Sequence, residues 1–240
     1  MIEKDPPSFP GKFDEPHSEV VSDAEILEEL NQPSPIPEKG WLSQKPLPGS
    51  LNSPAFLVAL CFLCSGLYWW SPWADQLVAP RGEVFQRPWV LLSSILVHSD
   101  ISHLASNSGL FLLFGWLLRA FIGRLAFPFL ALIAGVVTQI LSLITYHDRV
   151  VLLGASGMVY AMGGMWLCYY LFCEHRLSIA SKVFRILGFA MIVLLPSQIQ
   201  AQVSYRAHAI GFIVGFAIAG MSMAWVKRQL QERASAQLDL

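Results

Sequence analysis

The chain has 240 residues, of which 54% are hydrophobic and 14% are charged. Its mean hydropathy of +0.50 is typical of a membrane protein and excludes a water-soluble globule as the main body of the chain. The formal net charge is only −1, and we find no sequence signature of a nucleic-acid partner.

Residues 1–54 differ in composition from the rest of the chain. They hold ten of the seventeen acidic residues, four of the sixteen basic residues and ten of the fifteen prolines. Such a segment is too polar to bury a core, so we expect a solvated, mostly disordered cytoplasmic tail with one candidate helix at residues 22–30. The first residues lack a basic region followed by an apolar run, so we expect the first transmembrane helix, and not a signal peptide, to direct insertion.

Six apolar segments follow, and we expect each of them to be a transmembrane helix across a hydrocarbon core of about 30 Å. We expect Pro128 to be tolerated in the first turn of the third segment and Pro196 to unwind or kink the end of the fifth. Between the first two segments, the apolar piece 89–97 is too short to span, and Trp89 at its edge indicates a half-inserted loop. The six segments are residues 55–70, 101–122, 125–146, 151–172, 183–200 and 207–225.

The distribution of Lys and Arg predicts the orientation. Eight of these residues follow spans two, four and six, against four on the opposite side, and Lys39 and Lys45 add to the richer side. Because cytoplasmic loops carry the excess of Lys and Arg, both termini should be cytoplasmic, including a short polar tail at residues 227–240. A chain little longer than this core is expected in a bacterial inner membrane.

The four cysteines indicate neither a metal site nor a disulfide. Cys61 and Cys64 have a metal-like spacing, but they lie in an apolar run and no second pair repeats the spacing. We expect these two, with Cys168 and Cys173, to be apolar packing residues.

Three polar features stand out within the apolar segments. His103 and Asn107 lie one helical turn apart near the start of the second span, Ser156 lies near the start of the fourth, and His208 begins the sixth. All even-numbered spans run from outside to inside, so these groups should meet at one face, where polar side chains usually line a cavity. They comprise a nucleophile, a base and hydrogen-bond donors, which are the components of an acyl-transfer site.

Small residues predict how two of these spans pack. Residues of this kind repeat every fourth position on the sixth span, and the fourth span offers a matching surface. Small residues let helix backbones approach closely, so this packing would bring His208 to Ser156. Ordinary membrane packing without any chemistry would produce the same stripe. The residues are Ala207, Gly211, Gly215 and Ala219 on the sixth span, and Gly157 and Gly164 on the fourth.

Taken in order, the motifs resemble those of the rhomboid family of intramembrane serine proteases over about residues 55–226. The resemblance implies an all-α polytopic membrane protein, a bundle of six transmembrane helices with a half-inserted first loop. It also implies cleavage of single-span membrane proteins near the outer face of the bilayer, without metal or cofactor. The motifs are His98, His103-x-x-x-Asn107, Gly154-x-Ser156-Gly157-x-x-Tyr160 and Ala207-His208-x-x-Gly211-x-x-x-Gly215.

The resemblance further implies a role for each matched residue. Ser156 would be the nucleophile and His208 the general base of a Ser–His dyad without a third acid. His103 and Asn107, with the backbone N–H of Ser156, would stabilise the oxyanion. The remaining matched residues would support the site: Tyr160 by stacking on the catalytic imidazole, His98 by supporting the loop, and Gly154, Gly157 and Gly211 as small residues beside it.

Two positions depart from the family pattern. The first loop of the family usually carries Trp-Arg, whereas this chain has Trp89-Val90, which affects the hydrogen bonds that anchor the loop. Arg206 stands where the family tends to have a small or uncharged residue. Its charge would either act on the protonation of His208 or bind lipid headgroups.

Other functions were weighed against a protease. A catalytically inactive rhomboid relative that binds transmembrane clients would typically lack the nucleophile or the base, and both are present here. A small transporter or channel would show broken helices in paired halves, and only the fifth span has a proline beyond its first turn. A soluble-type hydrolase is excluded because its G-x-S-x-G motif needs glycine where this chain has Met158.

The fifth span is the expected route for the substrate. Pro196 and the polar run 197–202 predict that its end is the most mobile part of the core. A substrate helix would unwind and enter beside this span.

Overall fold

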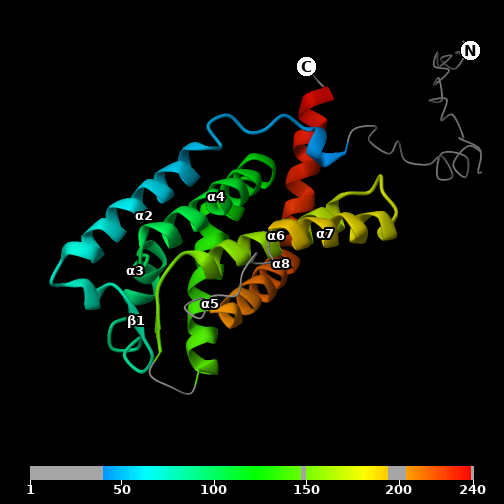
Figure 1. Cartoon of the computed structure of the whole chain (residues 1–240). Coiled ribbons are helices and arrows are strands. Elements are labelled where there is room, and N and C mark those ends of the chain that lie inside the picture. Colours follow the sequence, from blue (N-terminus) through cyan, green and yellow to red (C-terminus); the bar gives the residue numbers. More distant parts are fainter. Residues whose placement is uncertain (1–39, 147–149, 194–203, 239–240) are drawn as a thin grey trace, which may run out of the picture. The chain divides into compact units, whose positions relative to one another are not determined.

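The computed structural model describes residues 40–146, 150–193 and 204–238 (Figure 1). Three features of the sequence lie outside the described residues: the candidate helix at residues 22–30, Pro196 and the polar run 197–202. Most described residues are helical, and the 3-10 turns η1 (Trp41–Ser43) and η2 (Ala74–Gln76) are short. The helices are α2 (Asn52–Trp70), α3 (Val90–Leu96), α4 (Ile101–Leu117) continuing as η3 (Leu118–Ile122), η4 (Leu125–Leu130) continuing as α5 (Ala131–Thr145), α6 (Ser156–Cys173), α7 (Ile179–Val193) and α8 (Tyr205–Leu238).

Four described segments are long and apolar enough to cross a membrane: Asn52–Trp70, Ile101–Ile122, Leu125–Thr145 and Tyr205–Arg233. They match the first, second, third and sixth spans expected from the sequence. α6 has 18 residues and the described part of α7 has 15. The chain is therefore a multi-pass membrane protein, with four of the six expected spans borne out by length and composition.

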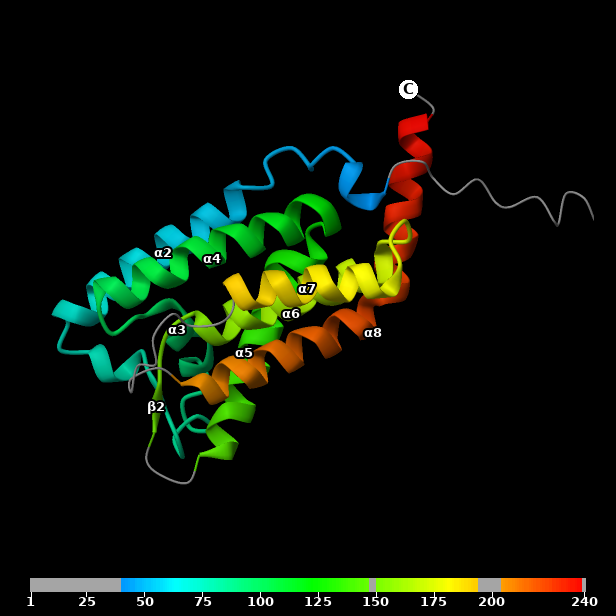
Figure 2. The same ribbon diagram turned by 45° about the vertical axis from the view of Figure 1, so that its right-hand side comes forward.

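α6 lies at the centre of the bundle and contacts α4, α5, α7 and α8 (Figures 1 and 2). Most of its residues are buried, including Met158, Met162 and Tyr169. A helix that is apolar on all sides is typical of such an enclosed position. Ser156, the candidate nucleophile, is the first residue of this central helix. The other helices of the bundle therefore surround the helix that carries it.

The contact between α6 and α8 is the most extensive in the fold. A Cβ atom on Gly215 would overlap the carbonyl of Ala161, and a Cβ on Gly211 would overlap the carbonyl of Gly157. A Cβ on Gly164 would likewise overlap a carbonyl of α8. Only glycine permits this approach of the two backbones, and the predicted small-residue packing is confirmed.

The expected start of the fourth helix at Val151 is wrong. Val151–Leu152 instead forms strand β2, which pairs antiparallel with β1 (Ala79–Pro80). Gly154 has a φ of +107°, and α6 begins only at Ser156. A left-handed residue interrupts a right-handed helix, and glycine adopts this conformation without steric cost. The candidate nucleophile thus lies at the N-terminus of the helix, not one turn inside it.

Pro128 does not lie in a regular first helical turn, contrary to the expectation. Phe127, which precedes it, is extended with φ −134° and ψ 125° inside η4. The residue before a proline is pushed out of the helical region by the pyrrolidine ring. Regular α-helix begins only at Ala131.

The described structure extends beyond the expected core at both ends. Trp41, in the segment expected to be a disordered tail, is buried against Trp166 with ring centroids 5.2 Å apart. α8 continues to Leu238 through most of the expected C-terminal tail. No Gly or Pro follows Gly220, so nothing in the sequence ends the helix.

Candidate active site

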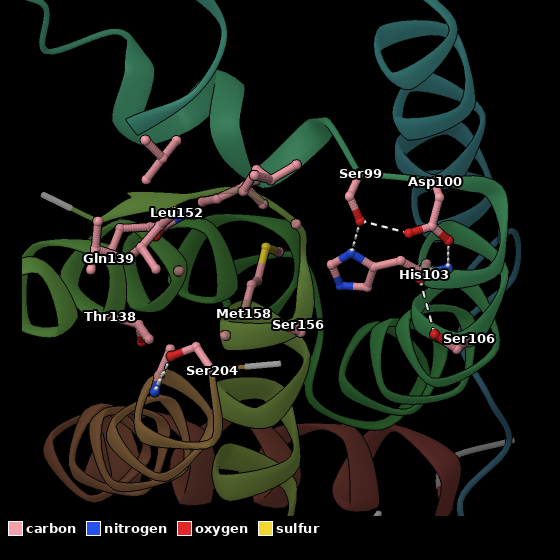
Figure 3. Close-up of a pocket in the computed structure, with 18 of the residues that line it drawn as sticks. Ser99, Asp100, His103, Ser106, Thr138, Gln139, Leu152, Ser156, Met158 and Ser204 are labelled. Carbon is pink, nitrogen blue, oxygen red and sulfur yellow. Dashed lines mark hydrogen bonds between the residues drawn. The ribbon is translucent and has the colours of Figure 1, made fainter. Parts of the chain in front are cut away.

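A cavity of about 960 Å³ lies between the starts of α4, α6 and α8 and the second half of α5 (Figure 3). Its lining is rich in polar groups, including Ser99, Asp100, His103, Ser156 and Ser204. The starts of three helices that the sequence places on one face therefore border one cavity. His103 and Ser156 both line this cavity, whereas Asn107 and His208 are not among its lining residues.

Ser156 is half-buried and lines the cavity as the first residue of α6. The loop before it is fixed, because the backbone N–H of Gly154 donates to the carbonyl of Ser94 in α3 at 2.8 Å. A Cβ on Gly154 would lie 2.8 Å from Cε1 of His103. Both the positive φ and this approach require glycine, so Gly154 brings the Ser156 loop against the His103 ring.

His98 joins this loop to α2. Its Nε2 accepts the backbone N–H of Ala155 at 3.2 Å, and its Nδ1 lies 3.3 Å from Oγ of Ser65. Trp69 donates from its indole nitrogen to the His98 carbonyl at 2.8 Å. Burial lowers the pKa of His98 to about 4, and the nearby His103 contributes in the same direction. These hydrogen bonds connect the Ser156 loop to α2 through His98.

His103 and Asn107 lie on one face of α4, one turn apart. Asp100 caps this helix by accepting the backbone N–H of His103 at 2.9 Å. The His103 ring lines the cavity and is joined to Ser99 by a hydrogen bond (Figure 3). Oγ of Ser99 lies 3.2 Å from Nδ1 of His103. Asn107 is buried, and among the described residues its Nδ2 has no hydrogen-bond partner. A buried amide donor without a partner is costly.

His208 lies beside α6 through its stacking on Tyr160. The two ring centroids are 4.0 Å apart and the ring planes are 11° from parallel. Its neighbour Ala207 lines the same cavity as Ser156, and His208 is close enough to His103 for their charges to interact. Within the described part of the chain, Nδ1 of His208 is buried without a hydrogen-bond partner.

The described residues contain no group of three or more His, Cys, Asp or Glu side chains that could hold a metal ion. All four cysteines have free thiols, and Cys61, Cys168 and Cys173 are buried. The polar side chains of the cavity are several hydroxyls, the imidazole of His103, the amide of Gln139 and the carboxylate of Asp100. Such groups suit proton transfer and hydrogen bonding.

A model of the rhomboid domain family matches residues 86–225, which is more than half of the chain. The chain belongs to the rhomboid family. The matched region contains every residue that the sequence analysis assigned to the site, from His98 to Gly211.

A curated relative is the Bacillus subtilis (strain 168) protein named "Putative rhomboid protease YdcA". It is 28% identical over 130 residues, which are 53% of this chain and 64% of the relative. The alignment thus spans less than two thirds of the relative's length.

Arg206, which departs from the rhomboid pattern, has contacts that neither sequence hypothesis anticipated. It donates to the carbonyl of Thr145 at 2.6 Å, and its guanidinium lies 4.6 Å from the centre of the Tyr146 ring. Tyr146 is also hydrogen-bonded to Ser204, whose Oγ accepts the backbone N–H of Ala207 at 3.1 Å. We call this set of contacts among Thr145, Tyr146, Ser204 and Arg206 the α5–α8 latch. It fastens the end of α5 to the start of α8, directly before His208.

Val90, which replaces the usual rhomboid loop Arg, is fully buried at the start of α3. Other groups hold this loop. Ser93 donates to the carbonyl of Leu77 at 3.0 Å, and Arg87 forms an ion pair with Glu83. Apolar packing and these two contacts anchor the loop in this rhomboid.

Sequence reasoning missed the latch and the contacts of Ser99 and Asp100. Of these contacts, only the N-cap of α4 by Asp100 could have been predicted from the sequence, because aspartate directly before an apolar helical run is an N-cap signal. The contacts of the latch join residues that are distant in the chain, and no local sequence pattern predicts them.

Proposed function

We propose that this rhomboid is an intramembrane serine endopeptidase that cleaves peptide bonds in or near transmembrane helices. The observation that carries the proposal is the shared position of Ser156 and the start of α8 at one polar cavity, with His208 stacked on Tyr160 beside it. Family membership and the relative's name point in the same direction. Its substrates are proposed to be single-span membrane proteins.

In the proposed reaction, Oγ of Ser156 attacks the carbonyl carbon of the substrate while the imidazole of His208 takes the hydroxyl proton. The negative charge that develops on the carbonyl oxygen is stabilised by Nδ2 of Asn107, by His103 and by the backbone N–H of Ser156. The N-terminal end of α6 adds its positive dipole. His208 then protonates the leaving amine, and water attacks the acyl-enzyme with His208 again acting as the base.

A dyad is favoured over a triad by the surroundings of His208. Its Nδ1 is buried, and among the described residues neither a carboxylate nor any other group is bonded to it. Stacking on Tyr160 would replace the third group as the means of orienting the ring.

We further propose six spans, with α6 and with α7 plus the residues after it as the fourth and fifth. α6 would be about 27 Å long at 1.5 Å per residue, which is close to the hydrocarbon thickness. α3, with seven residues, would be the half-inserted element. The Lys and Arg distribution favours cytoplasmic termini, and we propose this orientation together with a bacterial inner membrane as the location.

A fluorophosphonate probe tests the nucleophile. The full-length protein in detergent would be labelled as wild type, as Ser156→Ala and as His208→Ala. Ser108→Ala is the control, because the Ser108 hydroxyl donates to the carbonyl of Leu104 within α4. We expect labelling of wild type and the control, and none in the other two.

The possible results separate the alternatives. A folded wild type without labelling would favour an inactive relative that binds transmembrane clients. Labelling that survives Ser156→Ala would identify a different nucleophile. For substrate access beside the fifth span, a disulfide between α4 and α7 should abolish cleavage of a helical substrate, and undiminished cleavage would exclude that route.

A further inference from the structure

The Asp100 carboxylate uses both of its oxygens on residues at the start of α4. Oδ1 accepts the backbone N–H of His103 at 2.9 Å, and Oδ2 accepts the hydroxyl of Ser99 at 2.8 Å (Figure 3). The hydrogen bond from the His103 backbone has the largest effect on the pKa of Asp100 and lowers it below its ordinary value. The hydrogen bond from the Ser99 hydroxyl lowers it further. At neutral pH the carboxylate is therefore ionised and only accepts hydrogen bonds.

Ser99 has one hydroxyl proton and two neighbours that could receive it. Its Oγ lies 2.8 Å from Oδ2 of Asp100 and 3.2 Å from Nδ1 of His103. The charged carboxylate is the closer and the stronger acceptor, so the proton points to Asp100. Oγ then offers only lone pairs to His103, and its bond to Nδ1 requires that Nδ1 carries a proton.

A neutral imidazole has one nitrogen-bound proton, so a proton on Nδ1 leaves Nε2 unprotonated. Nε2 lies on the side of the Ser156 loop, because a Cβ on Gly154 would be 3.2 Å from it. A bare nitrogen cannot donate to an oxyanion. It donates only when the ring has taken up a second proton from solvent.

We propose that Ser99 and Asp100 are positioning residues that hold the His103 proton on Nδ1, so that His103 donates to an anion in the cavity only as an imidazolium. The part concerning the anion rests on the proposed protease function. The charged or titratable groups that face His103 are Asp100 on its own helix, His98 with ring centroids 5.1 Å away, and His208 from α8.

The tautomer can be read directly by NMR of the ¹⁵N-histidine-labelled full chain in detergent, without substrate. The chain has six histidines, and His103→Gln identifies the signals of His103. We expect neutral His103 to carry its proton on Nδ1 in wild type. In Asp100→Asn, the amide donates to Ser99, which then donates to Nδ1, so the proton should move to Nε2.

Two further variants complete the test. Asparagine caps helices as well as aspartate does, so Asp100→Asn should keep the fold, and Ser99→Ala gives a second removal of the Nδ1 acceptor. Ser102→Ala is the matched control, since Ser102 also lines the cavity and should leave the tautomer unchanged. A wild-type proton on Nε2, or an Nδ1 proton that persists in both Ser99→Ala and Asp100→Asn, would overturn the proposal.

The rate of substrate cleavage against pH tests the consequence for catalysis. In wild type the cleavage rate should fall as rising pH removes the second proton of His103, and Asp100→Asn should lack this fall because its neutral ring donates from Nε2. Parallel loss in both would overturn the catalytic part. The NMR result is independent of cleavage, so failure of the protease proposal, seen as an unlabelled wild type, is distinguishable from failure of this one.

Discussion

The imidazole of His208 and the phenol ring of Tyr160 lie face to face, with centroids 4.0 Å apart and planes 11° from parallel. The two residues come from α8 and α6, the pair of helices with the most extensive contact in the fold. The orientation of the candidate base is therefore set by a residue one turn after the candidate nucleophile on the same helix.

Replacement of Tyr160 by alanine should lower kcat by about tenfold, with a smaller effect on KM. Stacked aromatic pairs contribute about 0.5–1.5 kcal/mol, and loss of ring orientation adds to this effect. Tyr160→Phe keeps the stacked ring and should retain most of kcat. Steady-state cleavage of a transmembrane substrate measures both, and equal losses in the two variants would contradict a role for the stacking.

Replacement of Asn107 by alanine should separate activity from stability. If its Nδ2 donates to the oxyanion, kcat should fall by about 10²–10³-fold. Thermal stability in detergent should change little, because Nδ2 has no hydrogen-bond partner among the described residues and its removal breaks no bond there. A fall in melting temperature with kcat unchanged would instead indicate a structural role.

Replacement of Gly215 by alanine should destabilise the bundle by about 1–3 kcal/mol, because the new methyl group would overlap the carbonyl of Ala161. Gly220→Ala is a control on the same helix, since a Cβ there meets nothing within 4 Å. Alanine has a helix propensity better than glycine by about 1 kcal/mol, so this control should melt at the same or a higher temperature. Equal melting of the two variants would disprove the close packing of α6 on α8.

The α5–α8 latch should be needed for catalysis. Arg206→Ala removes the bond to Thr145 and the contact with the Tyr146 ring, and we expect a lower kcat because the start of α8 moves with His208. Arg206→Lys keeps the charge without the planar guanidinium and should restore only part of kcat. Arg81→Ala, at an exposed residue between β1 and α3, is the control. Full rescue by lysine would favour a purely electrostatic role.

Stability should depend on pH through His98. Its folded-state pKa of about 4 lies below the ordinary value of about 6.5. The unfolded chain therefore binds the proton more readily, so the contribution is complete above pH 6.5 and is lost as the pH falls towards 4. The total loss is on the order of 3 kcal/mol.

Thermal unfolding against pH would measure this dependence. His98→Gln should have a flatter profile than wild type between pH 4 and 6.5, since it has no ring to protonate. His175→Gln, at an exposed position, should keep the wild-type slope. A wild-type slope in His98→Gln would show that another group causes the dependence.

The fit between sequence and structure varies along the chain. Four span assignments were correct because a bilayer requires long apolar helices, and this requirement is visible in composition alone. The start of the fourth helix was wrong because residues 151–155 are as apolar as the helix that follows. The pairing of β2 with β1 and the positive φ of Gly154 prevent the helix from starting before Ser156. Apolar composition does not distinguish a strand or a turn from a helix.

The C-terminal extension of α8 shows a second kind of miss. The charged residues after 226 indicate exit from the membrane, but exit does not end a helix. Arg228 and Glu232 pair along the helix at 3.0 Å, and Arg233 donates to the carbonyl of Phe121 at 3.0 Å. Local helix propensity and this distant contact together continue the helix.

The sequence by itself determined the membrane class and the rhomboid resemblance, and it supplied the candidate site residues. Its small-residue stripe also predicted the contact of α6 with α8, because helical periodicity places every fourth residue on one face. Only the tertiary structure decided how Arg206 is used and which partners orient His98 and His103. These contacts join segments far apart in the chain, such as Thr145 and Arg206, whose sequence separation is 61. Local sequence patterns carry no information about such pairs.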